Sequence, residues 1–207
     1  MRSLLGELGR TTWMASFYLA GGTALALQLG HRRSIDLDFF TAIDPLDAAS
    51  RRRIIDALAV HDPHAIEDVE GNLVLRLGDA LHVAFLSYGY PLLDPPLAVE
   101  GVAVASIRDV GLMKLDAVIS RGSRKDFVDL YFVSQRMPID GLLDDAEAKY
   151  PFSRDFPLMA VTSLVRFENA DIDAPPEMLV EIRWEDVRAF FASEVRRLGE
   201  RWLGDRE

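Results

Sequence analysis

The chain contains no cysteine, which excludes disulfide bonds, thiolate metal ligands and a cysteine nucleophile. No apolar run is long enough to cross a membrane, and residues 1–10 lack the apolar core of a signal peptide. Basic residues are scarce as well, since 23 lysines and arginines face 33 acidic residues, for a net charge of -10. This balance disfavours non-specific binding of nucleic acid. We therefore expect a cytoplasmic protein that makes no membrane contact.

What is present is enough apolar material for a folded core. The 207 residues suffice for one domain or for a domain with a companion, and 49% of them are hydrophobic. Strand-like segments are concentrated in residues 1–105, whereas residues 106–207 have mainly helical patterns, the last helix being predicted over residues 184–203. We predict an α+β fold, with a mixed β-sheet and flanking helices followed by a helical C-terminal part.

The most informative stretch runs from residue 17 to residue 40. Strand-like residues 17–20 are followed by the pair Gly21-Gly22, by a compact helix-forming run and by Gly30, which is typical of a helix end. A second strand is predicted over residues 34–40. The segment therefore has the order strand, glycine turn, short helix, strand.

Two aspartates lie in the second of these strands. Because residues two apart in a strand point to the same face, Asp36 and Asp38 are expected side by side, with Ile35, Leu37 and Phe39 facing the core. Two adjacent carboxylates repel each other unless a cation joins them. Hard oxygen ligands of this kind suit Mg²⁺ or Mn²⁺ that also binds substrate phosphates. The alternative is an ordinary solvated face of an edge strand.

The glycine turn supplies the second half of a candidate site. Backbone N–H groups of Gly21, Gly22 and Thr23 lie at the start of a predicted helix, where anions are commonly bound. The alternative is a simple turn with no ligand. The ordered combination of glycine turn and paired aspartates favours a nucleotide–metal site.

These residues resemble a known family. Gly21-Gly22-Thr23 followed by Asp36-Leu37-Asp38 resembles the glycine and Asp-x-Asp signature of the nucleotidyltransferase superfamily, which includes DNA polymerase beta. The fuller string from Gly21 to Phe40, and a second block over residues 114–131, resemble the AbiEii/AbiGii toxin branch. The resemblance implies a nucleotidyltransferase core domain over residues 1–105 and a helical domain over residues 106–207 that closes the nucleotide cleft.

The resemblance also exposes one departure. Superfamily members commonly carry a third metal carboxylate on a neighbouring strand, and the position that aligns with it here is Ala84. His82 faces the same side of the strand and is one candidate for the general base, the alternative being a surface histidine. Two carboxylates still suffice for nucleotide-chelated Mg²⁺.

In the second block, Lys114 and Arg121 fall on one face of a predicted helix. They are candidate nucleotide-binding residues that grip a triphosphate, the alternative being an ordinary exposed basic face. Asp126 lies in the first turn of the next predicted helix, where it is either a helix cap or an anchor for Arg121 or Lys114. The resemblance implies the anchoring role, with base catalysis by one of the aspartates of this turn as a further alternative. The candidate catalytic residues are thus Asp36, Asp38, Lys114 and Asp126.

Several local predictions complete this description of the chain. Asp44 is expected to cap a helix that runs to about Val60, residues 61–64 to form a loop with surface histidines, and residues 99–105 to form one strand. A local basic face is possible despite the acidic bulk; its members are Arg32, Arg33, Arg51, Arg52 and Arg53.

Together these features predict transfer of a nucleotide from an NTP. One role is a toxin with a cognate antitoxin or in phage defence, which modifies RNA, such as tRNA, or protein. Another is an enzyme that nucleotidylates a partner, including an antitoxin that silences a toxin by adding AMP. The third is a degenerate nucleotide-binding module that keeps the fold but not turnover. The alanine at position 84 is the reason to consider this alternative.

Overall fold

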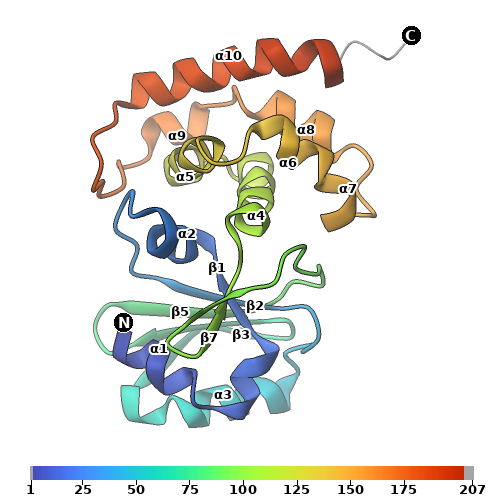
Figure 1. Ribbon diagram of the computed structural model, residues 1–207. Coiled ribbons are helices and arrows are strands. Elements are labelled where there is room, and N and C mark those ends of the chain that lie inside the picture. Colours follow the sequence, from blue (N-terminus) through green and yellow to red (C-terminus); the bar gives the residue numbers. More distant parts are fainter. Residues whose placement is uncertain (1, 203–207) are drawn as a thin grey trace. The chain divides into compact units, whose positions relative to one another are not determined.

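Figure 1 shows the computed structural model, which describes residues 2–202. Contacts divide the chain into two compact units. Unit 1 comprises residues 1–24 and 34–106, and unit 2 comprises residues 25–33 and 107–207. The predicted division, residues 1–105 and 106–207, differs from this one in residues 25–33, which group with the C-terminal helices, and in Ser106, which groups with unit 1. Leu203, the predicted end of the last helix, lies outside the described residues.

Unit 1 is built on a seven-stranded mixed sheet in the order β3-β4-β5-β2-β1-β7-β6. The strands are β1 Tyr18–Ala20, β2 Leu37–Thr41, β3 Pro63–Val69, β4 Asn72–Leu77, β5 Leu81–Ser87, β6 Leu97–Val99 and β7 Val102–Val104. Strand β2 is central: it pairs antiparallel with β1 and parallel with β5. The predicted mixed sheet is thus confirmed.

One face of this sheet carries the core of unit 1. Leu37 and Phe39 of β2 are fully buried, as are Val83 and Phe85 of β5. The rings of Phe39 and Phe85 stack with centroids 5.2 Å apart, and Phe17 meets Phe85 edge-on at 5.4 Å. Helices α1 (Arg2–Leu8) and α3 (Ala48–Ala57) lie on one side of the sheet (Figure 1). A 3-10 turn, η1 (Thr12–Ser16), follows α1 in the chain. The alternate residues of β2 therefore point to the opposite face.

Helix α3 begins later than predicted. Asp44 does not cap it, because its carboxylate accepts a hydrogen bond from the Leu46 N–H at 2.8 Å and Leu46 has a left-handed backbone, φ 48°. The helix begins at Ala48 with Asp47 as its N-cap, which accepts from the Ser50 N–H at 2.8 Å. It ends at Ala57 rather than near residue 60, and a short 3-10 turn, η2 (Ala59–His61), follows.

Two strand predictions need correction. Residues 63 and 64 belong to β3 rather than to a loop, because they pair with Leu77 and Arg76 of β4. The segment predicted as one strand over residues 99–105 is a hairpin of β6 and β7, turned at Gly101 with φ 82°. Strands β4 and β5 are joined by a tight turn in which Gly78 has φ 53°.

Unit 2 is helical, as predicted. Helix α2 (Gly21–Leu29) begins in unit 1 and its last residues group with unit 2, so one continuous helix connects the two. The remaining helices are α4 Ile107–Ser120, α5 Arg124–Ser134, α6 Ile139–Asp144, α7 Ala146–Lys149, α8 Phe156–Ser163, α9 Glu168–Ile172 and α10 Trp184–Trp202. Their core includes Phe127, Leu130 and Phe191, all fully buried.

Within the described residues 2–202, no helix is both long enough and apolar enough to span a membrane.

Candidate active site

The paired aspartates lie where β2 begins. Asp38 is the second residue of β2, and Asp36 immediately precedes the strand, which starts at Leu37 rather than at residue 34 as predicted. Leu37 and Phe39 are buried as expected, but Ile35 is 62% exposed. The prediction for Ile35 was wrong because residue 35 lies outside the ladder, so the strand's alternation does not extend to it. Asp38 points to the face opposite the core.

Gly21 packs directly against Asp38. Ala20, the last residue of β1, is the register partner of Asp38, and the next residue is Gly21 with φ 65°. A Cβ atom at position 21 would lie 2.8 Å from Asp38 Oδ2, closer than real contacts allow. Glycine is therefore required here for two reasons, the left-handed backbone and the close approach of a carboxylate.

Thr23 fixes the other aspartate. Its hydroxyl donates to the backbone carbonyl of Asp36 and lies 2.9 Å from the Ser34 hydroxyl, which in turn must donate to Thr23. Thr23 is almost fully buried. The Thr23 side chain therefore holds the chain before β2, while the backbone N–H groups of Gly22 and Thr23 start helix α2.

The neighbouring strand places alanine where a third carboxylate would stand. Ala84 of β5 is the register partner of Asp38 in the parallel ladder. His82, two residues earlier on the same face, has its Nδ1 atom 3.6 Å from Asp36 Oδ1. The arrangement thus offers two carboxylates and one imidazole on adjacent strands, and His82 is half exposed.

The donor set fits a cation that brings its own phosphate ligands. Among residues 2–202 no group of three or more histidine, cysteine or acidic side chains is placed to hold a metal alone. Two neighbouring carboxylates next to a glycine turn match the way Mg²⁺ is usually held, by one or two carboxylates plus substrate phosphates. Asp36 and Asp38 would be its protein ligands.

The contact between Gly21 and Asp38 gives a testable prediction. Gly21→Ala is expected to displace the Asp38 carboxylate and to weaken binding of Mg²⁺ with ATP roughly tenfold or more, since one lost charged contact is worth about 1.5–3 kcal/mol. Isothermal titration calorimetry measures this. The matched control is Gly78→Ala, which introduces the same left-handed strain at φ 53° with nothing within 4 Å. Equal effects of the two changes would contradict the prediction.

Unit 2 holds a buried cluster of charges built on α4 and α5. Lys114 Nζ lies 2.9 Å from Asp126 Oδ1 and 2.6 Å from Asp129 Oδ2. Arg121 binds Asp126 through Nε at 2.7 Å and Nη2 at 2.9 Å. The Ser123 hydroxyl donates to the same carboxylate at 2.6 Å. Asp126 therefore anchors both Lys114 and Arg121, which is one of the alternatives predicted for it.

Two residues of this cluster were missed as candidates. His31 and Arg32, which follow helix α2, both bind Asp129: Arg32 through Nε at 2.6 Å and Nη2 at 2.8 Å, and His31 through Nε2 at 2.8 Å. Asp129 and His31 are fully buried. His31 and Arg32 stand in the family-like string after Gly30, so the signal was present, but nothing in the sequence pairs them with a residue 98 and 97 positions away, respectively.

Burial and pairing set the charge states of the cluster. Burial raises the pKa of Asp129, but Lys114, Arg32 and His31 lower it by more, so the pKa lies well below its usual range. The pKa of Asp126 is likewise low, because Arg121 and Lys114 outweigh its burial. Burial lowers the pKa of Lys114, and the two carboxylates raise it above its ordinary value. All three groups are charged at neutral pH.

Lys114 and Arg121 differ in accessibility. The Lys114 side chain is 5% exposed and its ammonium meets two carboxylates, whereas the Arg121 side chain is 58% exposed. The contacts of Lys114 within unit 2 favour a role in organising the cluster. Arg121 retains exposed guanidinium surface while one edge is held by Asp126.

The five arginines considered from the sequence as a basic face all have acidic partners. The pairs are Arg32–Asp129, Arg33–Glu177, Arg51–Asp68, Arg52–Asp56 and Arg53–Asp44. Their charges are thus largely compensated.

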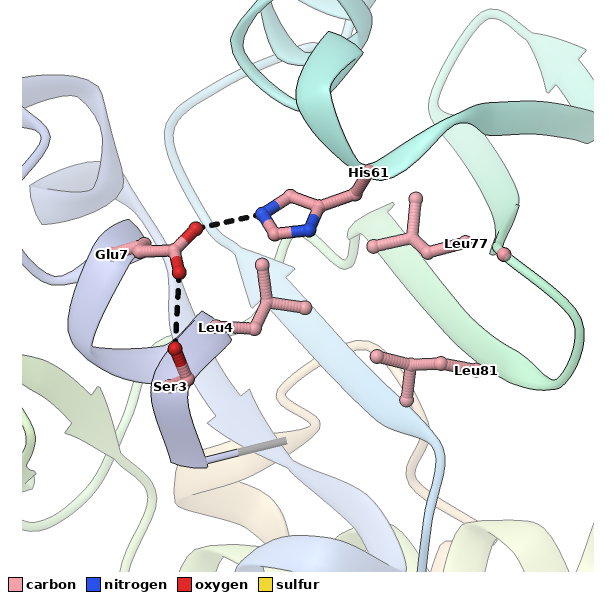
Figure 2. Close-up of a pocket in the computed structure, with 7 residues that line it drawn as sticks. Ser3, Leu4, Glu7, His61, Leu77 and Leu81 are labelled. Atoms are coloured by element: carbon pink, nitrogen blue, oxygen red, sulfur yellow. Dashed lines mark hydrogen bonds and ion pairs between the residues drawn. The ribbon is translucent and has the colours of Figure 1, made fainter.

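A pocket of about 330 Å³ lies elsewhere in unit 1 (Figure 2). Leu4 of α1 and Leu77 and Leu81 beside the β4–β5 turn supply its apolar wall, and His61 Nε2 meets Glu7 Oε2 at 2.7 Å across it. This hydrogen bond lowers the pKa of Glu7. Leu77 belongs to the core-facing set of β4, so the pocket is on the face of the sheet opposite Asp38.

Comparison with known proteins identifies relatives along most of the chain. The family model "Nucleotidyl transferase AbiEii toxin, Type IV TA system" matches residues 2–77. The uncharacterized protein aq_aa25 of Aquifex aeolicus (strain VF5) is 38% identical over 185 residues, covering 87% of this chain and 86% of that protein.

Solved structures share the fold. A candidate nucleotidyltransferase from H. pylori is similar over 100% of this chain and 95% of its own, with a TM-score of 0.58 and 21% identity. MenT4, the nucleotidyltransferase toxin Rv2826c from Mycobacterium tuberculosis, is similar over 97% of this chain and 87% of its own, with a TM-score of 0.54 and 14% identity. The architecture of this chain is therefore nucleotidyltransferase-like.

Proposed function

Because the chain belongs to the family of AbiEii nucleotidyltransferase toxins, we propose that it transfers a nucleoside monophosphate from an NTP to a hydroxyl group of an RNA, such as tRNA, or of a protein, and releases pyrophosphate. The observation that carries the proposal is the contact of Gly21 with Asp38, which brings a helix N-terminus and the paired aspartates together in unit 1. A cognate antitoxin protein would be its partner in a toxin–antitoxin system.

Each residue of the candidate site in unit 1 has a role in this proposal. Asp36 and Asp38 would hold Mg²⁺ or Mn²⁺, which neutralises phosphate charge when bound. The N–H groups of Gly22 and Thr23 would donate to the outer phosphates, where the helix dipole favours negative charge. The Thr23 hydroxyl keeps Asp36 in place through its backbone. His82, 3.6 Å from Asp36, is suited to accept the proton of an acceptor hydroxyl.

The unit 2 residues are proposed to bind a phosphate group and to balance the charge of the buried carboxylates. Asp126 holds the Arg121 guanidinium through Nε and Nη2, and this half-exposed group would bind a phosphate. Lys114 would support this arrangement by neutralising Asp126 and Asp129. Most of the rate enhancement would come from positioning and electrostatics, as is usual for phosphoryl chemistry.

A second candidate function is a nucleotide-binding module without turnover. The observation that favours it is Ala84, which occupies the position opposite Asp38 where a further carboxylate would help to activate the attacking group. In that case binding of the nucleotide would persist and transfer would be absent.

Transfer of label from α-³²P-labelled NTPs tests both candidates. The purified protein is incubated with Mg²⁺, each NTP and either bacterial RNA or bacterial protein, and the acceptor fraction is resolved on a denaturing gel. The proposal expects label in one fraction, lost in the presence of a metal chelator. Binding of NTP without label in either fraction, together with transfer restored by Ala84→Asp, would support the module instead.

A further inference from the structure

Beside the paired aspartates, on the same face of the sheet, unit 1 carries a row of aromatic rings. Phe40 follows Asp38 by two residues in β2 and stacks on Tyr18 of β1, with centroids 6.0 Å apart. Tyr88, just after β5, meets Phe40 edge-on at 5.4 Å, and Tyr90 meets Tyr88 at 5.0 Å. Phe40, Tyr88 and Tyr90, the aromatic row, are half-buried rather than part of the core.

Backbone pairing within the sheet fixes Phe40 and Tyr88 of the row. Phe40 pairs with Tyr18 on one side and with Leu86 on the other. The Tyr88 backbone N–H donates to the Thr41 carbonyl at 2.9 Å, which extends the β2–β5 pairing past the end of β5. Rings fixed in this way need little ordering when they bind a flat partner.

The register sets the order of features along the strands. Because β1 and β2 are antiparallel, Gly21 lies at the end where β2 begins, and Phe40 lies roughly 7 Å beyond Asp38 in the other direction. Along β2 the features therefore lie in the order glycine turn, paired aspartates and aromatic row. In phosphoryl transfer the attacking and leaving oxygens are roughly in line. With the outer phosphates at the glycine turn, the acceptor approaches from the side of the aromatic row.

The charge of unit 1 as a whole indicates what kind of contact it can offer. Unit 1 contains no lysine and six arginines against thirteen acidic residues. Arg51, Arg52 and Arg53, its one arginine run, are all paired with carboxylates. Contacts to a phosphate backbone are disfavoured there, whereas stacking on an aromatic ring needs no charge and tolerates every base.

Resting on the proposed function, we propose that the aromatic row is the acceptor subsite, where Tyr88 and its neighbours stack the unpaired 3′-terminal base of an RNA acceptor. The stacked base places its ribose hydroxyl toward Asp38, two residues along the strand from Phe40. The row thereby selects RNA with a single-stranded end over protein, and it does not hold the base of the NTP.

The test uses the full-length protein and single-stranded RNA 12-mers that end in 2-aminopurine, whose fluorescence is quenched by stacking. The wild type is expected to quench the 3′-terminal probe but not a 12-mer with the fluorophore at its centre. Tyr88→Leu should weaken binding about 5- to 150-fold, the range that loss of one base–aromatic stack produces. Tyr88→Phe keeps the ring and should stay within about threefold of the wild type.

Controls separate this subsite from the catalytic proposal. Phe152→Leu removes a ring that is 93% exposed in unit 2 and should leave quenching unchanged. Binding of ATP with Mg²⁺, measured by calorimetry, should be the same in Tyr88→Leu and wild type, and this measurement tests the proposed function separately. Absence of quenching by the wild type, equal weakening of ATP and RNA binding, or label transfer to protein alone would each overturn the acceptor subsite.

Discussion

Replacing Asp38 by asparagine is expected to reduce nucleotide transfer on the order of 10³-fold or more while leaving the protein folded. Asparagine has the same shape but no charge, so one of the two proposed metal ligands is lost. Metal-ion catalysis supplies several kcal/mol of charge stabilisation, and each 1.36 kcal/mol is a factor of ten in rate. The measurement is kcat/KM for transfer of α-³²P-labelled NTP at saturating Mg²⁺.

The stability of the Asp38→Asn variant is as informative as its activity. Asp36 and Asp38 are close in the chain and carry like charges, so removal of one charge relieves repulsion when no cation is bound. The thermal midpoint without Mg²⁺ is therefore expected to stay unchanged or to rise, and the increase that Mg²⁺ with ATP gives the wild type should disappear.

A matched control lies in the same sheet. Asp79 is exposed in the turn between β4 and β5, so Asp79→Asn changes the net charge equally without touching the site. It is expected to retain full activity. Comparable losses in both variants would show that net charge rather than metal binding is responsible, and full activity of Asp38→Asn would remove the basis of the catalytic proposal.

The parts of the fold that sequence predicted correctly depend on local patterns. The left-handed glycines at positions 21, 30 and 78 each stand where a helix or hairpin had to begin or end. The alternation of Leu37 and Phe39 with Asp38 follows directly from the strand's period of two. Such signals need only neighbouring residues, which is why they are visible in the sequence.

The errors arise where neighbours compete or where partners are distant. Asp44 and Asp47 are equally good caps by residue type, and the left-handed backbone of Leu46 decides between them. Lys114 was placed correctly on its helix, but the sequence did not show that its ammonium group is buried against two carboxylates. The pairing of Arg32 with Asp129 spans 97 residues, and no pattern in the sequence indicates it.

That distant pairing leads to the largest expected effect on stability. Asp129→Asn is expected to lower the free energy of unfolding by about 3–5 kcal/mol, the usual loss when one partner of a buried ion pair is removed. Asp129 is 0% exposed and accepts hydrogen bonds from His31, Arg32 and Lys114. An amide cannot neutralise the two cations, which would remain buried with less compensation. Urea unfolding followed by circular dichroism at 222 nm reports the loss.

The same residue predicts how stability depends on pH. The pKa of Asp129 is lower in the folded protein than its ordinary value of 3.8, so its contribution is complete above that value and is lost as the pH falls toward the folded pKa. The difference in stability between wild type and Asp129→Asn should therefore be constant from about pH 6 to 8 and should shrink below about pH 4. Asp186→Asn, which removes an exposed partner of Arg183 in unit 2, is the control and should have little effect at any pH. A loss in Asp129→Asn as small as this control, or one that persists unchanged at low pH, would show that the charge of Asp129 does not hold the segment after helix α2 to helices α4 and α5.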